Sequence, residues 1–180
     1  MWIKSLTNQK YYRSNICEEI LKFFNIKKNK NKKILINKKT KINKISIFPL
    51  SNSPIRTMPV IILNKLILLL KKNFDLEIFL DSNSSLSNFL YKNINFKNLK
   101  IIDPKDKLDL VKLIKNIEYG LFMDSGPLHV AKLFNKRGVL IESSVSEHIL
   151  LDDYNLIKSI ENNYSSAFCR APCGLTDIFN

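Results

Sequence analysis

The chain has 180 residues, of which 45% are hydrophobic and 10% aromatic, so it is long enough to bury the core of one globular domain. Its longest apolar run, Val60 to Leu70, is interrupted by Asn64 and Lys65 and is shorter than the ~20 residues of a membrane-spanning helix. The N-terminus shows no apolar segment with a cleavage site, and three cysteines make no disulfide framework, so we expect no signal peptide and a cytoplasmic location.

The formal net charge is +13, from 29 Lys and Arg against 16 Asp and Glu. A polyanionic partner such as nucleic acid, anionic lipid or a phosphorylated sugar would explain this excess. The alternative is a compositional bias, because Lys, Ile and Asn occur throughout and Gly is scarce. The densest basic run, Lys27 to Lys44, has no interleaved stacking aromatics, which favours composition over a nucleic-acid surface.

Residues 1–43 do not share the pattern of the rest of the chain. Asn15 to Phe24 carries apolar residues at helical spacing, with Ser14 or Asn15 as the cap and Cys17 on the apolar stripe. The basic, asparagine-rich stretch that follows has little to bury and is typical of a linker. We therefore divide the chain into an N-terminal helix with a basic linker, 1–43, and a folded domain, 44–180.

From residue 44 onward, short apolar strands alternate with helices at a spacing of roughly 20–25 residues. This alternation predicts βαβ units, a parallel sheet and right-handed crossovers, and so an α/β domain. The expected strands are 44–49, 76–80, 99–102, 119–123 and 138–141, with 155–160 as a candidate sixth. The expected helices are 59–72, 86–92, 108–116 and 126–135. In the third of these helices, Leu108, Val111 and Ile114 are expected to face the core, with Leu110 as a further candidate.

Polar residues follow every expected strand, namely Ser51 to Arg56, Asp81 to Ser85, Asp103, Asp124 to His129 and Glu142 to Ser146. Because the carboxyl ends of parallel strands lie along one edge of a sheet, these residues should gather there. Hydroxyls and carboxylates suit a sugar, and an arginine with a helix N-terminus suits a phosphate. This edge therefore predicts a site for a sugar that bears a phosphate.

The segment after the fourth strand is the most informative, because a tight polar turn there leads straight into an amphipathic helix. Gly126 is expected to give the turn backbone freedom, and Pro127 suits the first helical position. Asp124 or Ser125 can cap the helix. Free N–H groups and the positive end of the helix dipole would then bind an anion over Ser125 and Gly126, with His129 close by. The alternative is an ordinary strand–helix turn with a satisfied histidine.

Other site classes lack their sequence patterns. Neither a GxGxxG after the first strand nor a GxxxxGK[ST] is present, so neither a dinucleotide fingerprint nor a P-loop is predicted. His129 and His148 lie far from the cysteines, which argues against a zinc site. Cys169 and Cys173 are interpreted as structural or incidental, because two ligands alone do not make a metal site, with a metal or disulfide role as the alternative. The serines at 143–144 lack the G-x-S-x-G elbow of a hydrolase.

The segment Met123 to Ala131, MDSGPLHVA, resembles the D-[ST]-G-x-x-H-x-A signature of glycosyltransferase family 9, the heptosyltransferases of lipopolysaccharide core synthesis and their relatives. Ile47 to Ser51 and Arg56 to Pro59 are similar to the first strand and loop of the family's donor domain, with Met58 in place of the usual Trp and Arg56 where Lys is common. The resemblance implies a GT-B architecture, of which this chain covers the C-terminal domain, a Rossmann-like parallel sheet with flanking helices.

The resemblance also implies how this domain binds its donor, typically ADP-heptose. The donor-binding residues implied in this way are Asp124, Ser125, Gly126, His129, Ser51 and Arg56. Asp124 would bind sugar hydroxyls, and the others would lie along the diphosphate. No metal and no cofactor are expected, because the helix dipole and basic side chains would stabilise the leaving diphosphate. The turn at 141–144 lacks the family's glycine, so no residue is assigned to the nucleotide base.

The predicted function is therefore the donor-binding part of a glycosyltransferase that moves a sugar, with heptose as the expected one, from a nucleotide-diphosphate-sugar to a lipopolysaccharide or other envelope glycan. The family's catalytic base belongs to the acceptor domain and has no counterpart here, so we expect no transfer without a separate acceptor domain. The expected partners are the donor, a lipid-linked acceptor and, weakly, the inner face of the cytoplasmic membrane. The alternative is a basic α/β module that binds nucleic acid or anionic membrane through Lys27 to Lys44.

Overall fold

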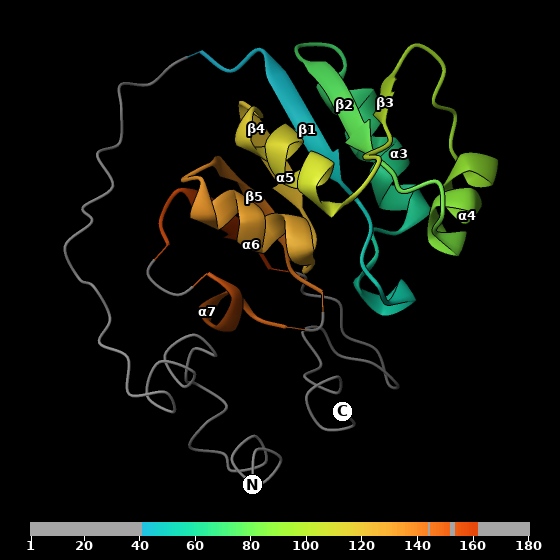
Figure 1. Ribbon diagram of the computed structural model, residues 1–180. Coiled ribbons are helices and arrows are strands. Elements are labelled where there is room, and N and C mark those ends of the chain that lie inside the picture. The colour runs from blue at the N-terminus through green and yellow to red at the C-terminus, as the bar shows by residue number, and fades with distance from the viewer. Residues whose placement is uncertain (1–40, 144, 152–153, 162–180) are drawn as a thin grey trace, which may run out of the picture.

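The computed structural model describes residues 41–143, 145–151 and 154–161 (Figure 1). Several predictions fall outside these residues, namely the helix at 15–24 with Cys17, most of the basic run 27–44, Ser144, and the pair Cys169 and Cys173. The division of the chain at residue 43 likewise stays a prediction.

A parallel sheet forms the centre of the described domain (Figure 1). Its strands are β1 (Lys44–Phe48), β2 (Asp75–Phe79), β3 (Lys100–Ile102), β4 (Tyr119–Phe122), β5 (Arg137–Ile141) and β6 (Ile157–Ile160). They lie in the order β3-β2-β1-β4-β5-β6, and every neighbouring pair is parallel. The predicted α/β fold is confirmed, and the candidate sixth strand is present as β6. The chain winds outward from β1 to β3 and then returns to the other side of β1 as β4.

Helices cover both faces of this sheet, as Figure 1 shows. They are α3 (Val60–Leu70), α4 (Ser85–Asn93), α5 (Lys107–Lys115), α6 (Gly126–Leu133) and the short α7 (Glu147–Leu150), and a 3₁₀ turn η1 (Pro54–Arg56) lies ahead of α3. The first two pack on one face of the sheet, and α5, α6 and α7 pack on the other. The side chain of Asp106 caps α5 by accepting a hydrogen bond from the amide of Asp109 at 2.8 Å.

Coverage of both faces explains why the strands are short and continuously apolar. In β1, Ile45 and Ile47 belong to the core under α3, and Phe48 belongs to the core under α5 and α6. Ser46 alternates with them and is also fully buried. Strands buried on both sides lose the polar–apolar alternation of a half-exposed sheet, which is the pattern that the sequence displays.

Two glycines shape the core on the α5–α6 face. The ring of Phe122 is fully buried and stacks on Phe48, with ring centroids 5.1 Å apart, and Phe48 stacks in turn on Phe79 at 4.3 Å. A Cβ added at Gly120 would overlap the ring of Phe122, and one added at Gly138 would overlap both that ring and the carbonyl oxygen of Gly120. These two positions must therefore lack a side chain so that the ring can fold back over β4 and β5.

One carboxylate is buried within the sheet near its amino end. Glu77 accepts hydrogen bonds from the ammonium groups of Lys100 at 2.7 Å and Lys44 at 3.5 Å, and from the hydroxyl of Ser46 at 3.4 Å. Burial alone would raise the pKa of Glu77, but the hydrogen bond from Lys100 and the charges of the two lysines hold it below its usual range. The fold thus neutralises this charge locally.

The prediction for the core face of α5 is right for Ile114 and for the candidate Leu110, and wrong for Leu108, which is 72% exposed. The core-facing stripe of the helix and the residues just after it is Leu110, Leu113, Ile114 and Ile117. These four residues have the i, i+3, i+4, i+7 spacing of one helical face. Leu108 falls outside that stripe because it lies two residues before Leu110, which places it on roughly the opposite side of a helix with 3.6 residues per turn.

Three helix starts differ by one residue from the prediction, because α3 begins at Val60, α4 at Ser85 and α5 at Lys107. The start of α6 at Gly126 agrees with the predicted range 126–135, so Pro127 is the second helical residue and not the first. Across the ranges that the structure describes, no helix has both the length and the apolar character needed to cross a membrane.

Replacing either sheet glycine by alanine should lower the free energy of unfolding by about 2 kcal/mol or more, because overpacking a closed core is costly. Adding Phe122→Leu should restore much of the stability of Gly120→Ala, since the ring is the obstacle there. It should restore little for Gly138→Ala, where the obstacle includes backbone. Urea unfolding of the single and double variants measures both coupling energies, and equal rescue would contradict this packing.

Candidate functional site

The loop after β1 is closed by its own hydrogen bonds, and this closure fixes Arg56. The amide of Met58 donates to the carbonyl of Pro49 at 2.8 Å, and the Met58 side chain is buried in the core. The Thr57 hydroxyl accepts a hydrogen bond from the Ser51 amide at 3.2 Å and lies 3.0 Å from the Ser53 carbonyl, to which it can donate. Arg56 is therefore presented by a tied loop with a defined path.

Ser51 is part of that closure. Its residue is buried, and its hydroxyl oxygen accepts a hydrogen bond from the amide of Ser53 at 3.5 Å. The prediction that Ser51 faces a diphosphate stays a prediction. In this structure the hydroxyl lies within its own loop. Thr57, to which the sequence analysis gave no role, is the residue that organises the loop.

The turn from β4 into α6 leaves the start of the helix open. Ser125 occupies the N-cap position with extended backbone, but its hydroxyl makes no capping hydrogen bond and lies 3.4 Å from the Met123 carbonyl instead. Gly126 is the first helical residue and has no left-handed backbone conformation, so the expected need for glycine in the turn is not what the structure shows. A Cβ added there would meet no atom within 4 Å. Open space therefore lies beside the helix N-terminus.

An ion pair joins the two loops. The Nη1 atom of Arg56 lies 3.3 Å from the Oδ2 atom of Asp124, whose residue is only 4% exposed. A carboxylate so deeply buried requires a cationic partner, and Arg56 supplies it. A guanidinium has five N–H donors, so this single contact leaves others available. The Nε atom of Arg56 is itself buried and has no acceptor among the residues that the structure describes.

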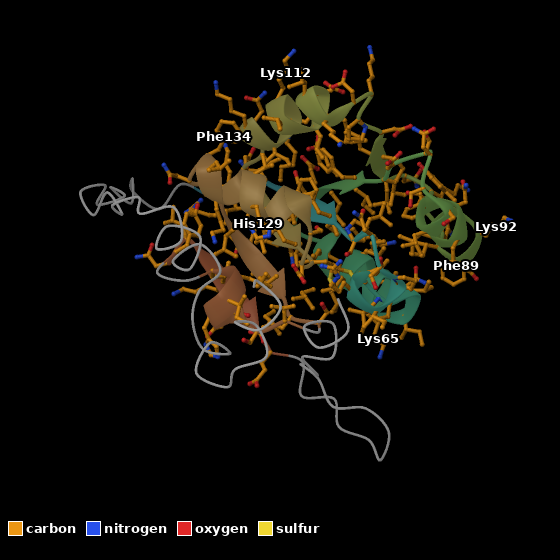
Figure 2. The ribbon with its side chains drawn as sticks, turned by 60° about the horizontal axis from the view of Figure 1, so that its bottom comes forward. Lys65, Phe89, Lys92, Lys112, His129 and Phe134 are labelled. Atoms are coloured by element: carbon orange, nitrogen blue, oxygen red, sulfur yellow. The ribbon has the colours of Figure 1, made fainter. Side chains whose placement is uncertain are left out.

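His129 lies on the first turn of α6, exposed and in the middle of the view in Figure 2. Partial burial of the imidazole and the positive charge of Lys132 lower the pKa of His129, and the negative charge of Asp124 partly opposes this shift. The imidazole is therefore mostly neutral at pH 7. The imidazole lies close enough to Asp124 to respond to its charge, and it belongs to the same helical turn as Ser125 and Gly126.

The end of β5 adds two polar residues to the same edge. Glu142 is 4% exposed and accepts a hydrogen bond from the hydroxyl of Ser159 on β6, while its amide donates to the Ile160 carbonyl at 3.1 Å. The Oγ atom of Ser143 is buried and has no partner within the described ranges. Glu142 is thus tied toward β6. Among the described residues, no group of three or more His, Cys, Asp and Glu is placed to hold a metal ion.

The strand order explains which predicted residues meet. The loop after β1 and the loop after β4 are neighbours because β1 and β4 pair in the sheet, and they bring Arg56 to Asp124. Ser125, Gly126 and His129 share the start of α6. The sheet reverses its winding between β1 and β4, and in open α/β sheets ligands bind beyond the carboxyl ends of the strands at such a reversal.

Comparison with solved structures places this arrangement among known folds. E. coli ADP-heptose LPS heptosyltransferase II aligns over 96% of this chain and 51% of its own, with a TM-score of 0.54 and 14% identity. E. coli heptosyltransferase WaaC with ADP aligns over 66% of this chain and 38% of its own, with a TM-score of 0.55 and 7% identity. The same enzyme with ADP-2-deoxy-2-fluoro heptose aligns over 71% of this chain and 39% of its own, with a TM-score of 0.53 and 12% identity.

The chain has a heptosyltransferase-like fold. The fold implied by the D-S-G-x-x-H resemblance is therefore confirmed, whereas the roles of individual site residues stay predictions. The chain spans about half, or less, of the length of these heptosyltransferases. Neither the scan against protein-family models nor the search of curated proteins gives a match.

The pKa of His129 should lie below its ordinary value near 6.5, and it should respond to charge with a defined sign. Lys132→Gln should raise this pKa and Asp124→Asn should lower it further, because one removes a positive and the other a negative charge. Imidazole NMR titration of each variant measures the shifts, with Lys112→Gln as the charge-matched control.

The same pKa predicts the pH dependence of stability. Between the folded and unfolded pKa values the folded chain binds fewer protons on His129, so this histidine destabilises the fold as the pH falls below about 6.5. His129→Asn should remove that part of the slope. A His129 pKa above that of the unfolded chain, or an inverted response to the two charge variants, would contradict the site geometry.

Proposed function

We propose that this chain is the donor-binding part of a glycosyltransferase and that the diphosphate of a nucleotide-sugar binds between Arg56 and the start of α6. The observation that carries the proposal is the buried, unpartnered Nε atom of Arg56, whose guanidinium is held by Asp124 beside an open helix N-terminus. An unpaired buried donor is unfavourable by about 1–3 kcal/mol, and an anionic ligand would remove that penalty.

Asp124 supports the proposal as a positioning residue. It is paired with Arg56 and almost fully buried, so its carboxylate holds the guanidinium in place. A fork of N–H donors fixed in this way suits a phosphate oxygen, for which arginine geometry is favourable. Binding of a sugar hydroxyl by Asp124 would then use only the part of the carboxylate that Arg56 leaves free.

The start of α6 supplies the second part of the proposed diphosphate site. The amide of Gly126 has no acceptor among the described residues, and the positive end of the helix dipole lies there. Because the space beside Gly126 is open, a phosphate could approach the backbone closely. In transfer, Arg56 and these dipoles would stabilise the charge that develops on the leaving diphosphate.

ADP-heptose is the donor we propose, because the neighbouring structures are an ADP-heptose enzyme and a heptosyltransferase with ADP or an ADP-heptose analogue. The proposed acceptor is a lipopolysaccharide or other lipid-linked envelope glycan, and the base that activates it would come from a separate acceptor domain. From that assignment we expect a transfer that inverts the configuration at the anomeric carbon and uses no metal or other cofactor. The fold likeness does not favour the alternative of a nucleic-acid-binding module.

The direct test is calorimetric titration of the full chain with ADP, ADP-sugars and UDP-sugars. Gly126→Ala should leave stability within about 0.5 kcal/mol, because its Cβ meets nothing, yet weaken ADP binding by crowding the phosphate. Arg56→Lys keeps a cation beside Asp124 but loses the fork of donors, and binding should fall roughly tenfold or more. Lys112→Gln, on α5, is the control with no expected effect.

A second readout reports on position as well as affinity. Bound ADP should raise the pKa of His129, because the diphosphate places negative charge beside the imidazole. The proposal fails if a folded chain binds none of these nucleotides, or if the Gly126 and Arg56 variants bind as the unchanged chain does.

A further inference from the structure

We propose that the outer face of α3 and α4 docks on an anionic lipid bilayer. We call this face the α3–α4 surface; its exposed members are Ile61, Ile62, Lys65, Leu68, Leu69, Lys71, Lys72, Phe89 and Lys92. Nothing in the described part of the chain covers these side chains. The inference stands apart from the nucleotide site, which uses the carboxyl edge of the sheet.

The apolar part of this surface is concentrated on α3. Leu63 and Ile67 face the core, while Ile61, Leu68 and Leu69 on the outer side are 68%, 55% and 65% exposed. A helix that is apolar on every side is normally buried, either in a protein core or in a membrane. Single exposed leucines are ordinary, but several on one helical face mark an interaction surface.

The charge on this surface has one sign. The stretches 54–74 and 82–99, which hold η1, α3, α4 and their loops, contain Arg56, Lys65, Lys71, Lys72, Lys92 and Lys97 and no Asp or Glu. The stretch 103–118, which holds α5 on the opposite face of the sheet, contains four Asp or Glu and four Lys. Among the described residues, the positive excess therefore lies on this face, whereas most of the chain's net charge of +13 belongs to residues 1–40.

Figure 2 shows how this face is oriented. Lys65, Phe89 and Lys92 are directed away from α3 and α4 on one side of the molecule, and Lys112 on α5 lies on another. An apolar stripe bordered by lysines and an exposed aromatic ring is the arrangement by which amphipathic helices lie in a membrane interface. The aliphatic stems of the lysines can extend along the apolar surface while their ammonium groups reach lipid phosphates.

Lys65 argues against a second copy of the chain as the occupant. It lies within the stripe, between Ile61, Ile62 and Leu68, Leu69, on the exposed side of α3. A symmetric contact through this stripe would bring like charges together, which is unfavourable. An anionic bilayer satisfies the apolar and the cationic side chains at once.

The surface also borders the candidate nucleotide site, since η1 with Arg56 leads directly into α3. If the proposed function holds, docking through α3 would bring the donor site close to a lipid-linked acceptor. The docking itself does not depend on that function.

The test is flotation of the full chain with vesicles of phosphatidylcholine alone and of phosphatidylcholine with an equal part of phosphatidylglycerol. The unchanged chain should float with the anionic vesicles only. Leu68→Ser with Leu69→Ser should reduce the partition coefficient about tenfold or more, because two apolar side chains no longer enter the interface. Both residues are exposed, so the fold should persist, which thermal unfolding checks.

A charge-matched pair of triple variants separates this surface from overall charge. Lys65→Glu, Lys71→Glu and Lys72→Glu should abolish flotation, whereas Lys105→Glu, Lys107→Glu and Lys112→Glu, with the same change in net charge, should reduce it far less. Equal losses in the two triples, or no effect of the leucine variants, would overturn the proposal. So would a dimer in sedimentation that the leucine variants dissociate.

ADP titration of the same variants keeps the two proposals distinguishable. The leucine and α3 lysine variants should bind ADP as the unchanged chain does, because none of them lies in the nucleotide site. Loss of flotation with ADP binding retained would support the docking surface alone, and flotation with no ADP binding in any variant would count only against the proposed function.

Discussion

The contact on which the candidate site depends is the ion pair of Arg56 with Asp124. The two residues are 68 positions apart and belong to loops that meet only because β1 and β4 are neighbours in the sheet. A carboxylate buried beside the start of a helix would be strongly unfavourable without this cation. The pair therefore ties the first loop to the turn that leads into α6. One electrostatic requirement of the fold thereby holds a guanidinium, with further N–H donors, beside that turn.

Much of the fold could be predicted because its strands are short apolar runs separated by caps, turns and amphipathic helices. β1, β4 and β5 follow this pattern within a residue or two. Strand order could not be predicted, since it depends on which surfaces pack together over long separations. Leu108 shows the limit of periodicity: its spacing from Val111 fits a helical face, but the face that packs is the one with Leu110, Leu113 and Ile114, and Leu108 lies on the other side of the helix. The steric demand of Phe122 on Gly120 and Gly138 was equally hidden, because it requires the register of paired strands.

The candidate site divides in the same way. Ser125, Gly126 and His129 were predictable as neighbours because a single turn of helix holds them. The partnership of Arg56 with Asp124 and the role of Thr57 were not, since both arise from loop closure. Gly126 was assigned for the wrong physical reason: its backbone is helical, and its value lies in the space that a missing side chain leaves. A motif can thus identify a position before the structure shows what that position does.

The distribution of charge over the two faces extends this reasoning beyond the site. Around α5 acidic and basic side chains balance, and Glu77 inside the sheet is neutralised by its own lysines. The stretches 54–74 and 82–99, which hold α3 and α4, contain no acidic residue, and Asp75 and Asp81 lie just outside them. The lysines of these stretches are exposed together with isoleucine and leucine. Among the described residues, the net positive charge coincides with exposed aliphatic side chains on one face. This combination favours a partner that is both anionic and apolar, and a lipid bilayer is the simplest surface that has both properties.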